Sequence, residues 1–159
     1  MDGRTANGDW HLRERADLAG GLVAWDRFGE GPPVVLVHGT PSWSYVWRAV
    51  VTPLAERCSV YLLDLIGYGD SEQCDGQDMS VAAQSQALAE LLDVWGLGRA
   101  ALVGHDIGGS IVLRTHLVEG HPAGRIALVD AAVLIPWNTP ATVHMKEHLE
   151  AYRTMPVHI

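Results

Sequence analysis

The residue that best fits a chemical role in this sequence is a carboxylate, Asp106, within the stretch Leu102–Ser110. It follows an apolar segment and precedes a helical pattern, with Gly104 two positions before it and Gly108 two positions after it. This spacing is typical of a nucleophile elbow, a sharp strand-to-helix turn that pushes its apex residue out of a sheet. Side chains at the two glycines would clash across such a turn. The pattern predicts that Asp106 is a nucleophile.

An aspartate at the apex favours attack on an electrophilic saturated carbon. Its carboxylate displaces a halide or opens an epoxide in one step, leaving an alkyl ester on the protein. Hydrolysis of that ester then needs an oxyanion hole and a general base. A serine hydrolase would need serine at 106, and Ser71 and Ser110 stand elsewhere in the pattern. The alternative without chemistry is that Asp106 only caps the following helix.

Two further turns follow apolar segments that we expect to be strands, at 38–41 and at 64–71. Ligands bind beyond the carboxyl ends of parallel strands, so both turns should lie near the elbow. We expect Asp64 and Asp70 to bond their own turn, and His38 and His105 to be mainly structural. Trp43 and Trp137 are candidates for lining a pocket, with ordinary packing as the alternative. Residues expected to shape these turns are His38, Gly39, Pro41, Gly104, His105 and Gly108.

The elements that must position these residues alternate between strands and helices. A hairpin is expected first, around the turn 18–21, and Pro53 should break or restart the first helix. Alternation of this kind indicates an α/β fold, a mostly parallel sheet flanked by helices. Strands are predicted at 10–17, 22–28, 34–37, 59–63, 100–103 and 125–129, and helices at 43–54, 80–95, 107–118 and from Pro140, with Met145, Leu149 and Tyr152 on one face.

Composition limits the function classes. The 159 residues are 48% hydrophobic and 19% charged, with a net charge of −8 and two cysteines. An acidic chain without a basic patch makes nucleic acid and anionic membranes poor partners, and the acidity itself says little about the substrate. The sequence has no signal peptide, no apolar run of about 18 residues and no paired cysteine motif. We therefore expect a cytoplasmic protein that needs no cofactor or metal.

Three motifs occur together and in order: the elbow, the 38–41 loop, and a turn with Asp64, Gly67, Gly69 and Ser71. In combination they resemble the α/β-hydrolase fold. Aspartate at the apex resembles the branch that includes epoxide hydrolases and haloalkane or haloacid dehalogenases. The segment 38–48 is particularly similar to the oxyanion loop and first helix of dehalogenases.

The resemblance implies an oxyanion hole formed by the backbone N–H groups of Thr40 and Ile107. This chain departs from the dehalogenase pattern at the halide site. Haloalkane dehalogenases hold the departing halide with Trp where this chain has Ile107, and often with Asn where it has Thr40, so the usual halide site is absent. Epoxide hydrolases protonate the epoxide oxygen with cap tyrosines, for which Tyr152 is the candidate here.

The family pattern also suggests how the chain is organised. We expect a disordered N-terminus at 1–9, the N-terminal part of the hydrolase core at 10–135 and the start of a helical cap at 136–159. In the family the general-base His and its acid partner come later, so we expect a fragment that lacks the C-terminal strands and most of the cap. Such a fragment would stall at the ester. The strand at 125–129 would be an open edge available for self-association.

Two other classes stay open. A non-catalytic binding protein with this fold is consistent with a missing base. His144, Glu147 and His148 also match H-x-x-E-H, a zinc signature that places both histidines on one helix face. The alternative for that segment is a solvated helix face.

Overall fold

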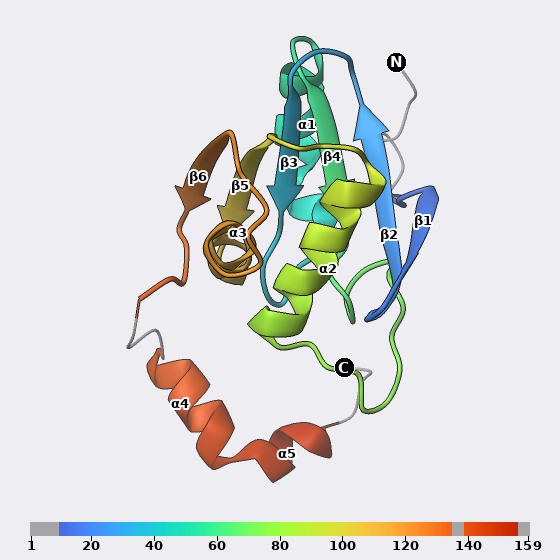
Figure 1. Cartoon of the computed structure of the whole chain (residues 1–159). Coiled ribbons are helices and arrows are strands. Elements are labelled where there is room, and N and C mark those ends of the chain that lie inside the picture. The colour runs from blue at the N-terminus through green and yellow to red at the C-terminus, as the bar shows by residue number, and fades with distance from the viewer. Residues whose placement is uncertain (1–9, 135–138, 156–159) are drawn as a thin grey trace.

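The computed structural model describes residues 10–134 and 139–155. Six strands form one sheet in the order β1-β2-β4-β3-β5-β6 (Figure 1). β1 and β2 are antiparallel, β2 meets β4 antiparallel, and the remaining pairs are parallel, which confirms the predicted fold class. The strands are β1 (Glu14–Leu18), β2 (Gly21–Phe28), β3 (Pro33–Val37), β4 (Ser59–Leu63), β5 (Ala101–His105) and β6 (Arg125–Val129). The helices are η1 (Ser44–Trp47, a 3₁₀ turn), α1 (Arg48–Ala55), α2 (Val81–Val94), α3 (Ile107–Leu117), α4 (Pro140–Glu147) and α5 (Leu149–Arg153).

The hairpin turns where the sequence predicts, with Leu18 paired to Gly21. Its first strand is shorter than predicted and begins at Glu14. The reason is that the Leu12 N–H donates to the Asp70 carboxylate at 2.8 Å and takes no place in the sheet ladder. Segment 10–13 therefore packs on a loop of the core.

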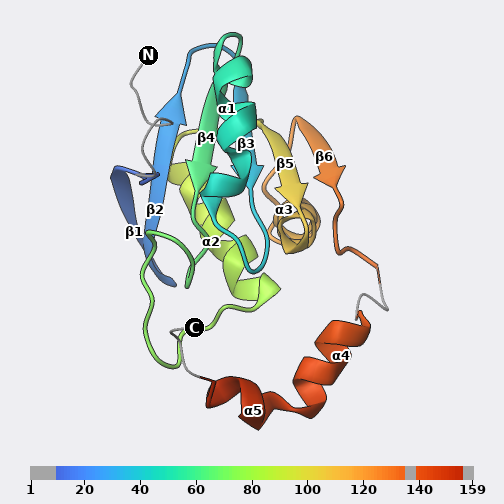
Figure 2. The same ribbon diagram turned by 180° about the vertical axis from the view of Figure 1, so that it is seen from behind.

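Helices cover both faces of the sheet, with α2 and α3 on one face and α1 on the other (Figures 1 and 2). Side chains of β3 alternate between the two cores: Val35 and Val37 pack with α2 and α3, and Leu36 packs with α1. A strand buried on both faces reads as a continuous apolar run, which is why 34–37 shows no polar alternation.

The first helix differs from the prediction in two ways. Pro53 lies inside α1 and does not end it, because a proline removes one N–H bond and α1 runs only two residues further. The buried face is formed by Trp47 and Val51, whereas Trp43 and Val50 are exposed. The helical spacing of Trp43, Trp47, Val50 and Leu54 predicts one buried face, which is correct for Trp47 and Leu54 and wrong for the other two. Trp43 precedes the helical segment and is therefore out of its register.

The helix α2 is close to its predicted bounds. The Ser80 hydroxyl caps it by accepting from the Ala83 N–H at 3.2 Å, and the left-handed Gly96 follows its end. Its buried face includes Gln84, whose side chain bonds both the N–H and the C=O of Ile66. α2 therefore fixes the turn that follows β4 as well as the core.

β6 is the edge strand of the described sheet, and Leu128 and Val129 on it are nearly half exposed. An edge with unpaired backbone groups is a template for another strand. Self-association through this edge stays a prediction.

The C-terminal helices lie apart from the sheet in both views (Figures 1 and 2). Thr139 caps α4 by accepting from the Thr142 N–H, and Pro140 takes the first helical position as predicted. The single continuous face predicted for this segment is wrong, because the helix is interrupted at His148 (φ −117°, ψ 31°). Over the described ranges, no helix is long and apolar enough to cross a membrane. The predicted boundary at 135/136 and the predicted disorder of segment 1–9 concern residues outside the described ones.

The core contribution of α2 is testable at one buried and one exposed position. Leu91 is fully buried against the sheet, while Val94 on the same helix is 62% exposed. Leu91→Ala should lower the free energy of unfolding by about 3 kcal/mol, since it leaves a cavity. Val94→Ala should change it by less than about 0.5 kcal/mol. Urea unfolding followed by circular dichroism measures both, and equal effects would contradict this packing.

Candidate active site

Asp106 stands at the apex of the β5–α3 turn with left-handed backbone angles, φ 55° and ψ −126°. Its N–H donates to Val129 O at 3.3 Å, and its C=O accepts from the Ala132 N–H at 3.0 Å. Backbone strain of this kind persists only where surrounding structure holds it, and it clusters at functional sites. The side chain makes no capping bond to α3, so the simple helix-cap interpretation of Asp106 is wrong.

Glycines around Asp106 allow three pieces of backbone to approach each other closely. A Cβ on Gly104 would lie 2.3 Å from Gly108 O, and one on Gly108 would lie 2.4 Å from Val37 O. A Cβ on Gly39 would lie 2.4 Å from the Asp106 Cβ. No side chain fits at these distances, so the turn depends on glycine at all three positions.

Thr40 is the residue that contacts the Asp106 carboxylate. Its backbone N–H donates to Asp106 Oδ2 at 2.8 Å, and its hydroxyl lies 3.2 Å from the same oxygen. Ile107 begins α3, so its N–H is among those that the helix leaves without an internal partner. A helix N-terminus favours negative charge. The Thr40–Pro41 peptide bond that follows this contact is cis.

His38 is fully buried and is held at both ring nitrogens. Its Nε2 accepts from the Leu65 N–H at 2.9 Å, which assigns the proton to Nδ1, 3.0 Å from Gly39 O. Burial lowers the pKa of His38, and the Asp64 carboxylate opposes that shift only in part. A neutral imidazole with both nitrogens engaged is a structural group.

His105 is the last residue of β5. Among the described residues, its ring forms no hydrogen bond with the Asp106 carboxylate, whose Oδ2 is bonded by Thr40. Its Nδ1 is buried without a hydrogen-bond partner there, and its ring lies edge-on to Trp47 with centroids 6.2 Å apart. This placement fits the expected packing role.

Asp64 does more than bond its own turn, which corrects the expectation for it. It is fully buried, and it accepts from the Ser44 N–H at 2.7 Å as well as from the Asp70 N–H at 2.9 Å. Asp70 in turn accepts from the Leu12 N–H and contacts His11. The two carboxylates thus join loops that are distant in sequence and hold the loop that carries Thr40.

Trp43 lines a surface pocket of about 460 Å³, together with Trp10, Tyr45 and Asp70 among others. Asp106 does not line that pocket, so Trp43 belongs to a hollow separate from the elbow. Trp137, the other pocket candidate, lies outside the described residues.

Two residues near the elbow escaped the sequence analysis. Tyr68 packs edge-on against His38, with ring centroids 5.7 Å apart; burial, and then the Asp106 charge, raise the pKa of its phenol. Asp130 directly follows β6 and has φ 44°, so Asp106 and Asp130 are the two non-glycine residues with positive φ in the described chain. The sequence signal that could have found Tyr68 is its place between Gly67 and Gly69. Asp130 has no such signal, and it is recognised only by its positive φ in the structure.

The arrangement of elbow, Thr40 loop and sheet order can be compared with known proteins. The sequence profile of the alpha/beta hydrolase fold matches residues 32–153. The chain belongs to the α/β-hydrolase fold family. The expected family is thereby confirmed, and the resemblance to dehalogenases and epoxide hydrolases is supported by named relatives.

Haloalkane dehalogenase 2 of Mycobacterium tuberculosis is 28% identical over 142 residues, which are 89% of this chain and 48% of that protein. A soluble epoxide hydrolase of Corynebacterium sp. is 42% identical over 84 residues, 52% of this chain and 29% of that enzyme. The crystal structure of an alpha/beta hydrolase fold protein from Burkholderia ambifaria superposes with a TM-score of 0.87 at 39% identity, covering 92% of this chain and 54% of that one. The chain thus spans about half or less of these relatives' length.

The H-x-x-E-H segment lies on α4, away from the elbow. The rings of His144 and His148 have centroids 4.4 Å apart. Within 10–134 and 139–155, no third histidine, cysteine, aspartate or glutamate joins them in a metal-binding group. The segment therefore lacks the third ligand of a catalytic zinc site among the residues described.

The glycine requirement of the elbow predicts a specific stability loss. Gly104→Ala should destabilise the fold by about 3 kcal/mol, because its Cβ collides with backbone that cannot rotate away. Gly98→Ala is the matched control, since nothing lies within 4 Å of its added Cβ. Chemical unfolding measures the free energy of unfolding of both variants, and a Gly104→Ala variant as stable as the unaltered chain would contradict the close approach of backbone at Gly104.

The buried neutral His38 predicts a pH dependence. Its folded pKa is lowered, whereas the unfolded value is about 6.5. Below that pH the unfolded chain binds more protons, so the stability supplied by His38 is present at pH 8 and lost as pH falls. His38→Gln should therefore cost more stability at pH 8 than at pH 5 in urea titrations. A pH-independent difference would contradict a neutral His38.

Proposed function

We propose that this chain carries the nucleophile of an aspartate-dependent hydrolase whose substrate is a small molecule with an electrophilic saturated carbon, an epoxide or an alkyl halide. The observation that carries the proposal is the Thr40 N–H bond to Asp106 Oδ2 at the strained apex. One carboxylate oxygen is held, and the other is available for attack. The Mycobacterium and Corynebacterium relatives, named as a haloalkane dehalogenase and an epoxide hydrolase, support this chemical class.

In the first step Asp106 Oδ1 forms a bond to the substrate carbon. The bond from that carbon to its halide or epoxide oxygen breaks, and its electron pair leaves with the halide or stays on the oxygen as an alkoxide. Oδ2 becomes the ester carbonyl oxygen and keeps the Thr40 N–H as its donor. When water later attacks this carbonyl, charge develops on Oδ2, where donors of an oxyanion hole stabilise it.

The second step needs a general base within reach of the ester. His38 does not serve, because both of its nitrogens are engaged. His105 makes no contact with the carboxylate in the described residues. We therefore assign ester formation to this chain and leave hydrolysis to a base outside the described site.

Between the two substrate types, the site favours an epoxide. Ile107 offers no N–H side chain to a departing halide, in contrast with the tryptophan expected at that position in haloalkane dehalogenases. Burial and then the Asp106 charge raise the pKa of the Tyr68 phenol, which is protonated at neutral pH even without this shift. A protonated phenol is a suitable donor to the alkoxide that ring opening creates.

Covalent labelling tests the nucleophile directly. Incubation with styrene oxide, and separately with 1-bromobutane, should add one adduct to the Asp106 peptide in mass spectrometry, with the epoxide reacting faster. Asp106→Asn should remove that adduct because the amide is a poor nucleophile. Adducts at Cys58 and Cys74 map to other peptides and are scored separately.

Asp130→Asn is the matched control for this experiment. Asp130 is also an aspartate in left-handed backbone at a neighbouring strand end, but no N–H of the described residues donates to its carboxylate. It should leave the Asp106 adduct unchanged. Labelling of Asp130 in place of Asp106 would refute the assignment, and no carboxylate adduct with either reagent would favour a non-catalytic binding protein.

A further inference from the structure

Two exposed histidines stand one turn apart at the end of α4. His144 and His148 are four residues apart, so their side chains leave the same helix face. Their ring centroids are 4.4 Å apart, with planes at 56°. Within the described chain, neither imidazole takes part in a hydrogen bond or an ion pair. The two rings thus face each other with their nitrogens uncommitted.

The backbone holds this pair in place. The His148 N–H donates to His144 O at 3.0 Å, which closes the last turn of α4. His148 then departs from helical angles and separates α4 from α5. The pair therefore spans the turn at which the helix is interrupted.

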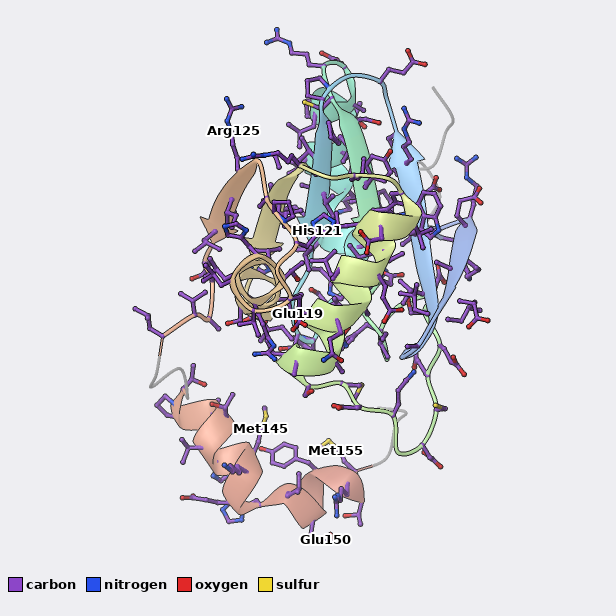
Figure 3. All side chains as sticks on the ribbon, in the orientation of Figure 1. Glu119, His121, Arg125, Met145, Glu150 and Met155 are labelled. Carbon is purple, nitrogen blue, oxygen red and sulfur yellow. The ribbon has the colours of Figure 1, made fainter. Side chains whose placement is uncertain are left out.

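The apolar face of the segment is distinct from the histidine pair. Figure 3 shows Met145 on α4 and Met155 just after α5 projecting toward the side where the sheet lies, with Glu150 on the opposite side. Met145 lies one residue after His144, about 100° around the helix. A ligand on the histidines would therefore leave the methionine face free.

Neutral imidazole is a preferred ligand for zinc, copper and nickel. Zinc–nitrogen bonds of about 2.0–2.1 Å at tetrahedral angles place two nitrogens about 3.4 Å apart. Rings whose centroids are 4.4 Å apart reach that spacing by side-chain rotation alone. No existing hydrogen bond has to break for this rotation, so binding carries little reorganisation cost.

We propose that His144 and His148 form a two-histidine site for one divalent late transition-metal ion, with water in its remaining positions. The ion would be Zn²⁺, Ni²⁺ or Cu²⁺, since Mg²⁺ and Ca²⁺ prefer oxygen ligands. The site clamps the last turn of α4 and takes no part in the chemistry of Asp106. It is independent of the proposed hydrolase function.

Titration of the untagged, reduced full chain tests the site. Every protein in this experiment also carries Cys58→Ser and Cys74→Ser, so that thiols do not bind the metal. Calorimetry and native mass spectrometry with ZnCl₂ should show one ion per chain, and MgCl₂ should show none. Zinc should also slow hydrogen exchange of the His148 amide, because the ion bridges the two residues that this amide bond joins.

Three variants separate the site from surface binding in general. His148→Ala should weaken zinc binding about tenfold or more, since even groups that only support a ligand are worth 10–100-fold. His11→Ala should leave zinc binding unchanged, because this exposed histidine lies outside the α4–α5 segment and contacts Asp70. Lys146→His combined with His148→Ala keeps two histidines on α4 but two residues apart, on different faces, and should not restore binding.

The outcomes are decisive in both directions. The two-histidine site is supported if zinc binding is lost in His148→Ala, is kept in His11→Ala and is not restored when Lys146→His is added to His148→Ala. Zinc binding that survives His148→Ala, that returns with the histidine at 146, or that is absent in the starting chain would overturn it. The side chains of His11, Lys146 and His148 are exposed, whereas Cys58 is partly buried, and circular dichroism checks that each variant folds.

Discussion

The close approach of three backbone segments around Asp106 is the constraint on which the site depends. β5 ends against the loop after β3 so tightly that Gly39, Gly104 and Gly108 have no room for a Cβ. This contact places the Thr40 N–H on the carboxylate, and hydrogen bonds from the β6 side hold the apex in its strained conformation. Sterics therefore come first, and the electrostatic environment of the carboxylate follows from them.

A buried polar network keeps the loops at the distance that this contact requires. Asp64 joins the loop before η1 to the turn after β4, and His38 joins the start of the same loop to Leu65. Buried polar groups are costly unless they are hydrogen-bonded. Each of these buried groups has a hydrogen-bond partner, which favours a fixed arrangement of the loops around Asp106. The network thus supports the site without touching a substrate.

Positive-φ backbone strain is shared by Asp106 and Asp130. Both are aspartates with positive φ at the ends of adjacent parallel strands. They differ in their surroundings: Asp106 receives an N–H from Thr40 and lies beside Tyr68. The α4–α5 segment lies apart from the sheet in Figure 1.

Much of this architecture follows from the sequence alone. Apolar runs, glycine spacing and the Ser80 and Thr139 caps are local signals, and they predicted the sheet class, most strand bounds and the elbow at Asp106. Tertiary structure decided what depends on distant partners: Thr40 lies 66 residues from Asp106, and Asp64 lies 20 residues from Ser44. It also decided the buried face of α1, the survival of that helix through Pro53, and the interruption at His148. Local patterns specify backbone conformation, whereas the partner of a buried donor or acceptor is set only when the elements pack.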